Sequence, residues 1–202
     1  EHGTPRELLE FLNQHALSLT DAYSILELRR ALPNGGVSLA YQPIMDIKKG
    51  CVGGVEAFVR WEHPLRRWRG AQKIRNLAET VALTPALGWF VTSESVGQIA
   101  GRDWATPVRL HLNVTASQVN HPGFARMLVA AGVKAGLGIV AEFQEREVPL
   151  IERAPLSELL EGGVRIAVDN FASGSADLCY LTWLQPSVLK VALCGWERLT
   201  PG

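Results

Sequence analysis

The sequence predicts an α/β fold in which a largely parallel sheet carries helices in the connections between its strands. Short apolar runs with strand character alternate with longer helical patterns, which is typical of repeated strand–helix units. A closed barrel of this kind needs eight strands, whereas this chain offers about six. We therefore expect a TIM-like (β/α) barrel, truncated to about six strands, with N-terminal helices before it. The predicted strands cover residues 37–41, 52–59, 108–113, 138–143, 164–168 and 188–192.

The segment before the first strand predicts two helices. Apolar residues recur at helical spacing over residues 5–17, and a second helical pattern covers 21–32. The turn-forming residues 33–36, Pro-Asn-Gly-Gly, end the second pattern. We therefore divide the chain into an N-terminal helical segment, 1–33, and a barrel domain, 34–202.

The connections between the predicted strands follow the same rhythm. A polar, basic loop is expected over 62–70, and we interpret its arginines as a solvated charged surface, with attraction for an anionic ligand as the alternative. Helical patterns occupy the remaining connections. They cover residues 74–82, 86–99, 123–135, 149–160 and 176–184.

The composition narrows the class of protein. Lys+Arg and Asp+Glu are balanced at 20 each, so nothing in the total charge indicates a nucleic-acid or membrane-surface partner. No apolar run approaches the roughly 18 residues of a spanning helix, and no signal peptide is visible. The three cysteines are far apart, which is typical of reduced thiols rather than of a disulfide framework. We therefore expect a cytoplasmic protein without a membrane segment.

Polar side chains stand at the ends of four predicted strands. These residues are Glu56, Asn113, Glu142 and Asp169, which lie in or directly after the second halves of their strands. In a β/α barrel the carboxyl ends of the strands converge on one rim. Three carboxylates and one amide oxygen on one rim suit a hard divalent cation such as Mg²⁺ or Ca²⁺. The alternative is that these side chains face water or cap the next helix.

Short motifs follow one another along the predicted strands. They are Tyr41-Gln42-Pro43-Ile44, Gly54-Val55-Glu56-Ala57-Phe58-Val59-Arg60-Trp61, Leu112-Asn113-Val114-Thr115, Glu142-Phe143-Gln144-Glu145, Val168-Asp169-Asn170-Phe171 and Leu189-Lys190-Val191. In this order they resemble the motifs of the bacterial EAL domain family, over about residues 22–194. Members of that family hydrolyse the second messenger cyclic di-GMP, or bind it without hydrolysis.

The resemblance implies a metal site and a catalytic pair. It makes Glu56, Asn113, Glu142 and Asp169 the ligands of a first divalent cation, Mg²⁺ or Mn²⁺, with Ca²⁺ binding without turnover. It makes Lys190 the residue that orients or activates the attacking water, so that Glu56 and Lys190 are the catalytic residues of an active enzyme. We expect one ion rather than two.

The resemblance also implies a nucleotide site. Gln42 and Arg60 match positions that line the cyclic di-GMP site of the family. An arginine suits a phosphate because its planar guanidinium presents a fork of donors. The alternative for Arg60 is a buried structural ion pair.

Several departures from the family pattern are specific. Asn170 stands where the family has a second Asp that holds a second cation, and Ala192 replaces another Asp. Ala172 replaces a Gly, which is strained if the position needs a positive φ. The family's later Glu motif is not found in this chain. Because two cations normally generate the attacking hydroxide, we expect a degenerate domain with little hydrolysis.

Three functions remain open from the sequence. We favour a non-catalytic module of cyclic di-GMP signalling that senses the nucleotide or binds a protein. The competing hypothesis is a phosphodiesterase that converts cyclic di-GMP to linear pGpG with a divalent metal. A third is an interaction protein that has lost the nucleotide. An open sheet edge next to 188–192 further predicts a protein partner or a homodimer.

Overall fold

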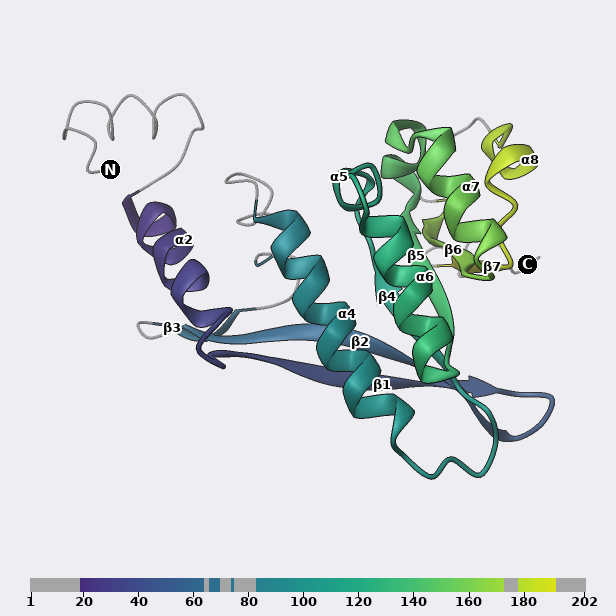
Figure 1. Cartoon of the computed structure of the whole chain (residues 1–202), viewed down its shortest axis with the longest axis horizontal. Helices are drawn as coiled ribbons and strands as arrows, with labels where there is room; N and C mark the ends of the chain where they lie inside the picture. Colours follow the sequence, from purple (N-terminus) through teal and green to yellow (C-terminus); the bar gives the residue numbers. More distant parts are fainter. Residues whose placement is uncertain (1–18, 64–65, 70–73, 75–82, 173–177, 192–202) are drawn as a thin grey trace, which may run out of the picture. The chain divides into compact units, whose positions relative to one another are not determined.

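The structure of the chain is a computed structural model (Figure 1). It divides into two compact units, which we describe separately: the first holds residues 1–40 and 59–87, and the second holds 41–58 and 88–202. The predicted helices 5–17 and, apart from residue 74, 74–82 lie outside the described residues, and the boundary at residue 33 stays a prediction. The structure describes residues 19–63, 66–69, 74, 83–172 and 178–191.

The main sheet follows the predicted strands. Its strand order is β1-β2-β4-β5-β6-β7, and β2, β4, β5, β6 and β7 pair in parallel. All six predicted strands are therefore confirmed, and β1 and β2 are longer than expected. The strands are β1 (Val37–Asp46), β2 (Cys51–His63), β4 (Arg109–Asn113), β5 (Gly138–Gln144), β6 (Arg165–Phe171) and β7 (Val188–Val191).

One further strand was not predicted. β3 (Arg66–Arg69) pairs antiparallel with the end of β2, with Trp61 opposite Arg69 and His63 opposite Arg66. The expectation of a loop throughout 62–70 is wrong at these residues. A run of Arg and Trp has no alternation of apolar and polar residues, so periodicity does not predict it. Its strand character comes from backbone pairing with its neighbour.

The helices fill the predicted connections, with shifted ends. The predicted helix 149–160 begins only at Arg153, because Pro149 belongs to the preceding 3-10 helix, which ends at Leu150. A short α5 was not predicted. The last helix begins at Tyr180 instead of residue 176. The helices are α2 (Leu19–Ala31), α4 (Thr84–Ala100), α5 (Ala116–Val119), α6 (Phe124–Ala135), η1 (Glu145–Leu150), α7 (Arg153–Glu161) and α8 (Tyr180–Leu184).

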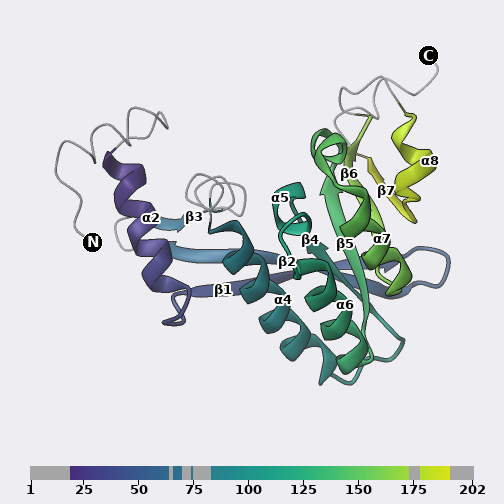
Figure 2. The same cartoon turned by 45° about the horizontal axis from the view of Figure 1, so that its top comes forward.

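The core of the second unit is built on the central strands. Four of the seven residues of β5, from Val140 to Phe143, are at most 2% exposed, which is typical of a parallel sheet covered on both faces. Helices α6 and α7 lie side by side against β5 and β6 (Figures 1 and 2). They contribute fully buried Leu128 and Leu159 to the core. This packing fixes the strands whose ends carry the polar residues.

The sheet is an open, curled half-barrel. Within the described residues, β7 pairs with β6 on one side and lies at the end of the strand order. The expected truncated barrel of about six strands is confirmed. Association through this edge stays a prediction. In the described part of the chain, no helix combines the length and apolar character needed to cross a bilayer.

Candidate functional site at the carboxyl ends of the strands

The strand register places the predicted polar residues on one face of the sheet. Glu56 on β2 lies opposite His111 on β4, and Asn113 lies opposite Glu142 on β5. Residues directly opposite each other share a face, and so do residues two apart on a strand. These four side chains therefore share a face by register. Asp169 shares it as well, because it is two residues beyond Ala167, which lies opposite Glu142.

Lys190 joins the two glutamates. Its Nζ donates to Oε2 of Glu56 at 2.6 Å and to Oε2 of Glu142 at 2.6 Å. The remaining carboxylate oxygens have partners of their own: Asn113 Nδ2 donates to Glu56 Oε1 at 2.7 Å, and His111 Nδ1 lies 2.6 Å from Glu142 Oε1. All four oxygens of the two glutamates are thus engaged, in a network that draws on β2, β4, β5 and β7.

Burial makes these contacts strong. The side chain of Glu142 is 0% exposed, that of Glu56 is 10% exposed, and that of Lys190 is 26% exposed. Charged groups removed from water need paired charges and hydrogen bonds to offset their desolvation. The network supplies both to each carboxylate, which explains how the sheet tolerates two acidic side chains at its inner face.

The environment drives the pKa values of the two glutamates apart. Burial raises the pKa of Glu56, and the negative charge of Glu142 raises it further. Burial opposes ionisation of Glu142 as well, but the hydrogen bond from His111 and the charge of Lys190 outweigh it and lower its pKa. Despite burial, the two carboxylates raise the pKa of Lys190. Glu142 and Lys190 therefore form the ionised pair, and Glu56 is the carboxylate that protonates more easily.

His111 is a member of the cluster that the sequence did not single out. It is 6% exposed and lies within β4, two residues before Asn113. Gly54 on the neighbouring strand makes room for its ring: a Cβ at this glycine would lie 3.1 Å from both Cδ2 and Nε2 of His111. The only available signal was a histidine in an apolar strand, two residues before a predicted ligand.

The Asp169 segment is arranged differently. Its carboxylate Oδ2 accepts a hydrogen bond from Nδ2 of Asn170 at 3.4 Å, and Asn170 itself is exposed. Asn170 and Ala172 both have positive φ, 56° and 63°. The condition set for strain at Ala172 is therefore met. Asparagine accepts the left-handed region more readily than alanine does, so Asn170 fits its backbone and Ala172 does not.

The two predicted nucleotide contacts fall in different units. Gln42 is an exposed residue of β1 in the second unit. Arg60 is half-buried on β2 in the first unit, and its Nη1 donates to the carbonyl of Val59 at 3.0 Å. The alternative of a buried ion pair for Arg60 and its role in nucleotide binding both stay predictions.

The donor set has the chemistry of a hard-cation site. Glu56 and Glu142 offer carboxylates, and the oxygen of Asn113 is the atom that a cation would take from its amide. Within the residues that the structure describes, no three His, Cys, Asp or Glu side chains are arranged as a metal site. By donor type alone these residues suit Mg²⁺ or Mn²⁺. In the arrangement that the structure describes, the Lys190 ammonium supplies the positive charge between the two carboxylates.

A second polar contact lies directly after β5, the strand that carries Glu142. Glu145, 4% exposed, accepts a hydrogen bond at 2.9 Å from the hydroxyl of Tyr180 on α8. Burial and the neighbouring Glu145 carboxylate raise the pKa of Tyr180 to about 12. This contact ties the end of β5 to the helix that precedes β7, the strand of Lys190.

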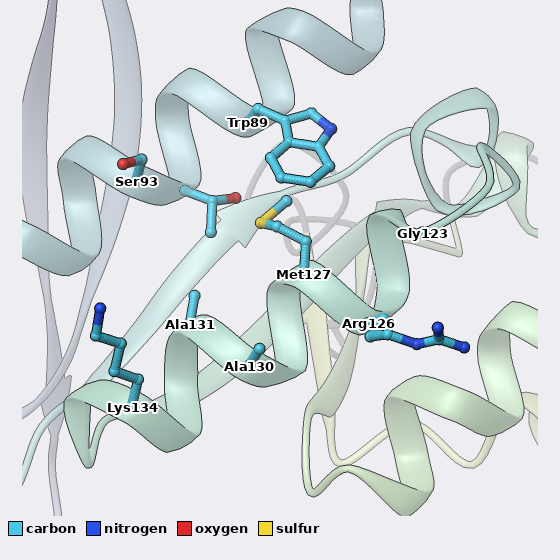
Figure 3. Close-up of a pocket in the computed structure, with 9 residues that line it drawn as sticks. Trp89, Ser93, Gly123, Arg126, Met127, Ala130, Ala131 and Lys134 are labelled. Atoms are coloured by element: carbon cyan, nitrogen blue, oxygen red, sulfur yellow. The ribbon is translucent and has the colours of Figure 1, made fainter.

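The second unit also has a hollow of about 490 Å³ between α4 and α6, which contains none of the predicted site residues (Figure 3). Trp89 of α4 and Met127 of α6 point toward each other at one end, and Lys134 lies at the other. Small residues such as Ala130 and Ala131 line the stretch between them. The hollow is thus mainly apolar and separate from the acidic cluster.

The chain is similar to proteins of one family. The profile of the family described as "EAL domain" matches residues 25–193. The chain is 32% identical over 185 residues to the uncharacterised protein Rv1357c of Mycobacterium tuberculosis, covering 85% of this chain and 59% of the relative. It is 32% identical over 165 residues to the cyclic di-GMP phosphodiesterase PA2567 of Pseudomonas aeruginosa, covering 77% and 28%. The chain therefore spans less than two thirds of the length of these curated relatives.

Solved structures agree with the fold. The PaMucR phosphodiesterase in complex with c-di-GMP matches with a TM-score of 0.71 and 28% identity, covering 87% of this chain and 75% of that one. The FimX EAL domain of Pseudomonas aeruginosa bound to c-di-GMP matches with a TM-score of 0.74 at 17% identity, covering 89% and 74%. At 17% identity, the similarity to the FimX EAL domain supports the fold alone.

Proposed function

This chain belongs to the EAL domain family, and on that premise we propose that it binds cyclic di-GMP together with one divalent cation without hydrolysing it. The relatives named as phosphodiesterases and the structural neighbour solved with c-di-GMP support the ligand. Gln42 and Arg60 are the residues of this chain that we assign to the nucleotide. Glu56, Asn113, Glu142 and Asp169 are those that we assign to the cation, Mg²⁺ or Mn²⁺.

We infer the absence of hydrolysis from the segment around Asn170. A second cation beside Asp169 would need a carboxylate at residue 170, and an amide there provides no negative charge. The Asn170 amide instead donates a hydrogen bond to Asp169. This bond occupies one carboxylate oxygen of Asp169, and Asp169 is the only acidic residue of the two. Phosphodiester hydrolysis depends on a charge clamp that polarises the phosphate and generates the nucleophile. With one such carboxylate absent, we expect binding to persist and turnover to fail.

The cation, when bound, would neutralise phosphate charge and lower the pKa of a bound water. The side chains of this chain have their own tasks in the proposal. The buried carboxylates of Glu56 and Glu142 hold the cation, and the ammonium of Lys190 keeps them together and offers a donor to a phosphate oxygen or a water.

The experiment separates binding from turnover. Calorimetry with cyclic di-GMP in the presence of Ca²⁺ should record binding, and Glu56→Ala should weaken it. Chromatography after incubation with Mg²⁺ or Mn²⁺ should find no linear pGpG from the natural sequence. Asn170→Asp is the matched variant, because it replaces the amide by a carboxylate of the same shape. Wild-type turnover that disappears in Glu56→Ala would overturn the proposal.

A specific observation favours the second candidate, an active phosphodiesterase. Glu56, Asn113, Glu142 and Lys190 contact one another directly, and Lys190 is the residue that the family resemblance assigns to the attacking water. If one cation and this lysine suffice to generate the nucleophile, pGpG forms and Lys190→Met abolishes it. The same chromatographic assay decides between the two candidates.

We extend the proposal to the binding partners and the cellular location of the protein. We infer a cytoplasmic module that signals through a protein partner or a homodimer and does not bind nucleic acid. In the described part of the chain Cys51 and Cys179 form no disulfide, and reduced thiols are typical of a reducing compartment. Light scattering at micromolar concentration, with and without cyclic di-GMP, tests the homodimer.

A further inference from the structure

The contact between His111 and Glu142 is the least expected feature of the cluster. The imidazole Nδ1 lies 2.6 Å from Glu142 Oε1, and the exposures of the two side chains are 8% and 0%. Because an ionised carboxylate can only accept, Nδ1 is the donor when Glu142 is ionised. A buried carboxylate with one oxygen fixed by an imidazole has its other oxygen aimed in a defined direction.

That direction is toward the rest of the cluster. Glu142 Oε2 receives the ammonium of Lys190 at 2.6 Å, and the same ammonium reaches Glu56. The backbone of Glu142 is held as well, because its carbonyl accepts from the amide of Val114 at 2.9 Å. The main chain and Oε1 are thus anchored on β4. The other oxygen, Oε2, accepts from Lys190, which also donates to Glu56.

The room for His111 is built into the neighbouring strand. Gly54 lies on β2, and a Cβ at this glycine would approach the imidazole Cδ2 and Nε2 of His111 and the backbone oxygen of Arg109 to 3.1 Å each. That approach is tighter than an ordinary contact and would force the ring to shift. The missing side chain at residue 54 therefore leaves the space that the ring of residue 111 occupies.

We propose that His111 is a positioning residue that orients the Glu142 carboxylate for a divalent cation, and that Gly54 secures the place of its ring. The inference rests on the proposed function, in which Glu142 holds the cation. His111 acts through Glu142 and has no task at the nucleotide. Outer-shell partners of this kind alter metal affinity by roughly 10- to 100-fold when they are removed.

The variants separate orientation from folding. His111→Leu removes the donor, and we expect the dissociation constant for Mn²⁺, measured by calorimetry without nucleotide, to rise about 10- to 100-fold. His111→Asn places an amide nitrogen near the position of Nδ1 and should restore most of the affinity. Gly54→Ala leaves the histidine in place but displaces its ring, and should give an intermediate loss. His121→Leu is the control, because His121 is exposed and lies outside the cluster.

A spectroscopic readout tests the contact itself. A buried imidazole N–H that donates to a carboxylate gives a proton resonance far downfield, and this signal should disappear in His111→Asn and in Glu142→Leu. It should persist in His121→Leu. If His111→Leu does not fold, His111→Asn and Gly54→Ala still report the affinity.

The outcomes are distinguishable. Wild-type affinity in both His111→Leu and Gly54→Ala would overturn the positioning role while leaving the cation site intact. Equal loss in His111→Leu and His111→Asn, without rescue, would assign His111 to packing and overturn the inference too. A wild-type chain that does not bind Mn²⁺ at all would overturn the proposed cation site, and this inference with it.

Discussion

Replacing Lys190 by methionine tests the charge balance of the cluster. Methionine keeps much of the length and apolar surface of the lysine side chain but removes the ammonium, which contacts Glu56 and Glu142 at 2.6 Å each. The two carboxylates would then face each other without a cation, at 10% and 0% exposure. We expect the metal-free protein to be less stable and its affinity for a divalent cation to rise, because the ion no longer competes with a tethered positive charge.

The magnitude follows from burial. Removing one partner of a buried ion pair costs about 3–5 kcal/mol. Lys190 is 26% exposed, so part of its charge is already screened by water, and about 2–3 kcal/mol is the appropriate estimate. For a domain of this size, that loss corresponds to a fall of roughly 5–10 °C in Tm. The raised pKa of Lys190 means that its contribution is complete below the unfolded pKa and is lost as pH rises through the folded pKa.

Thermal unfolding followed by circular dichroism at neutral pH, with EDTA or with Mn²⁺, measures both effects. Lys134→Met is the matched control on an exposed residue of α6 and should change Tm little. The double variant Lys190→Met with Glu56→Gln should recover part of the loss, because only one carboxylate then remains charged. If Lys190→Met in EDTA unfolds at the wild-type temperature, the ammonium does not hold the glutamates together and the account of the cluster fails.

Three further changes test other parts of the structure. Ala172→Gly should raise the free energy of unfolding by about 0.5–1 kcal/mol in urea titrations, since glycine accepts φ 63° without strain; an unchanged midpoint would contradict this. The pKa of Tyr180, raised to about 12, should delay its phenolate absorbance, and stability should fall as pH rises from about 10 toward that value. Tyr180→Phe should remove that late step and leave the rest of the titration in place. Gly162→Ala should cost about 1–3 kcal/mol, because its Cβ would lie 2.3 Å from a valine methyl, whereas Gly97→Ala in α4 meets nothing within 4 Å and should be neutral or stabilising.

The sequence anticipated the strands whose burial is complete. The apolar runs over 138–143 and 164–168 form β5 and β6, because central strands of a parallel sheet bury residues on both faces. β3 escaped prediction because backbone pairing, rather than side-chain burial, makes it a strand. The start of α7 was predicted too early, because Pro149 and Leu150 belong to the preceding 3-10 helix rather than to an α-helix.

Part of the candidate site could also be predicted from the sequence. The carboxylates of Glu56 and Glu142 could be predicted because acidic residues stand out within apolar strand sequences, although Glu56 lies in the middle of β2 rather than at its end. Their mutual partners were not, since hydrogen bonds between residues far apart in the chain leave no local pattern. His111 has a sequence neighbourhood of ordinary strand residues, and its importance arises from Gly54 on another strand.

The network of Lys190 links residues 134 positions apart in the chain. Glu56 belongs to β2, near the beginning of the sheet, and Lys190 belongs to β7, the last described strand. The two carboxylates therefore lack their countercharge until the final strand has docked against β6. A chain folded only as far as β6 would keep its acidic residues in place, but their negative charges would repel each other without compensation. The affinity of the site for a divalent cation therefore changes when β7 completes the sheet. Loss of β7 would therefore alter Glu56 on β2, a strand with which β7 does not pair and which it reaches only through the Lys190 side chain.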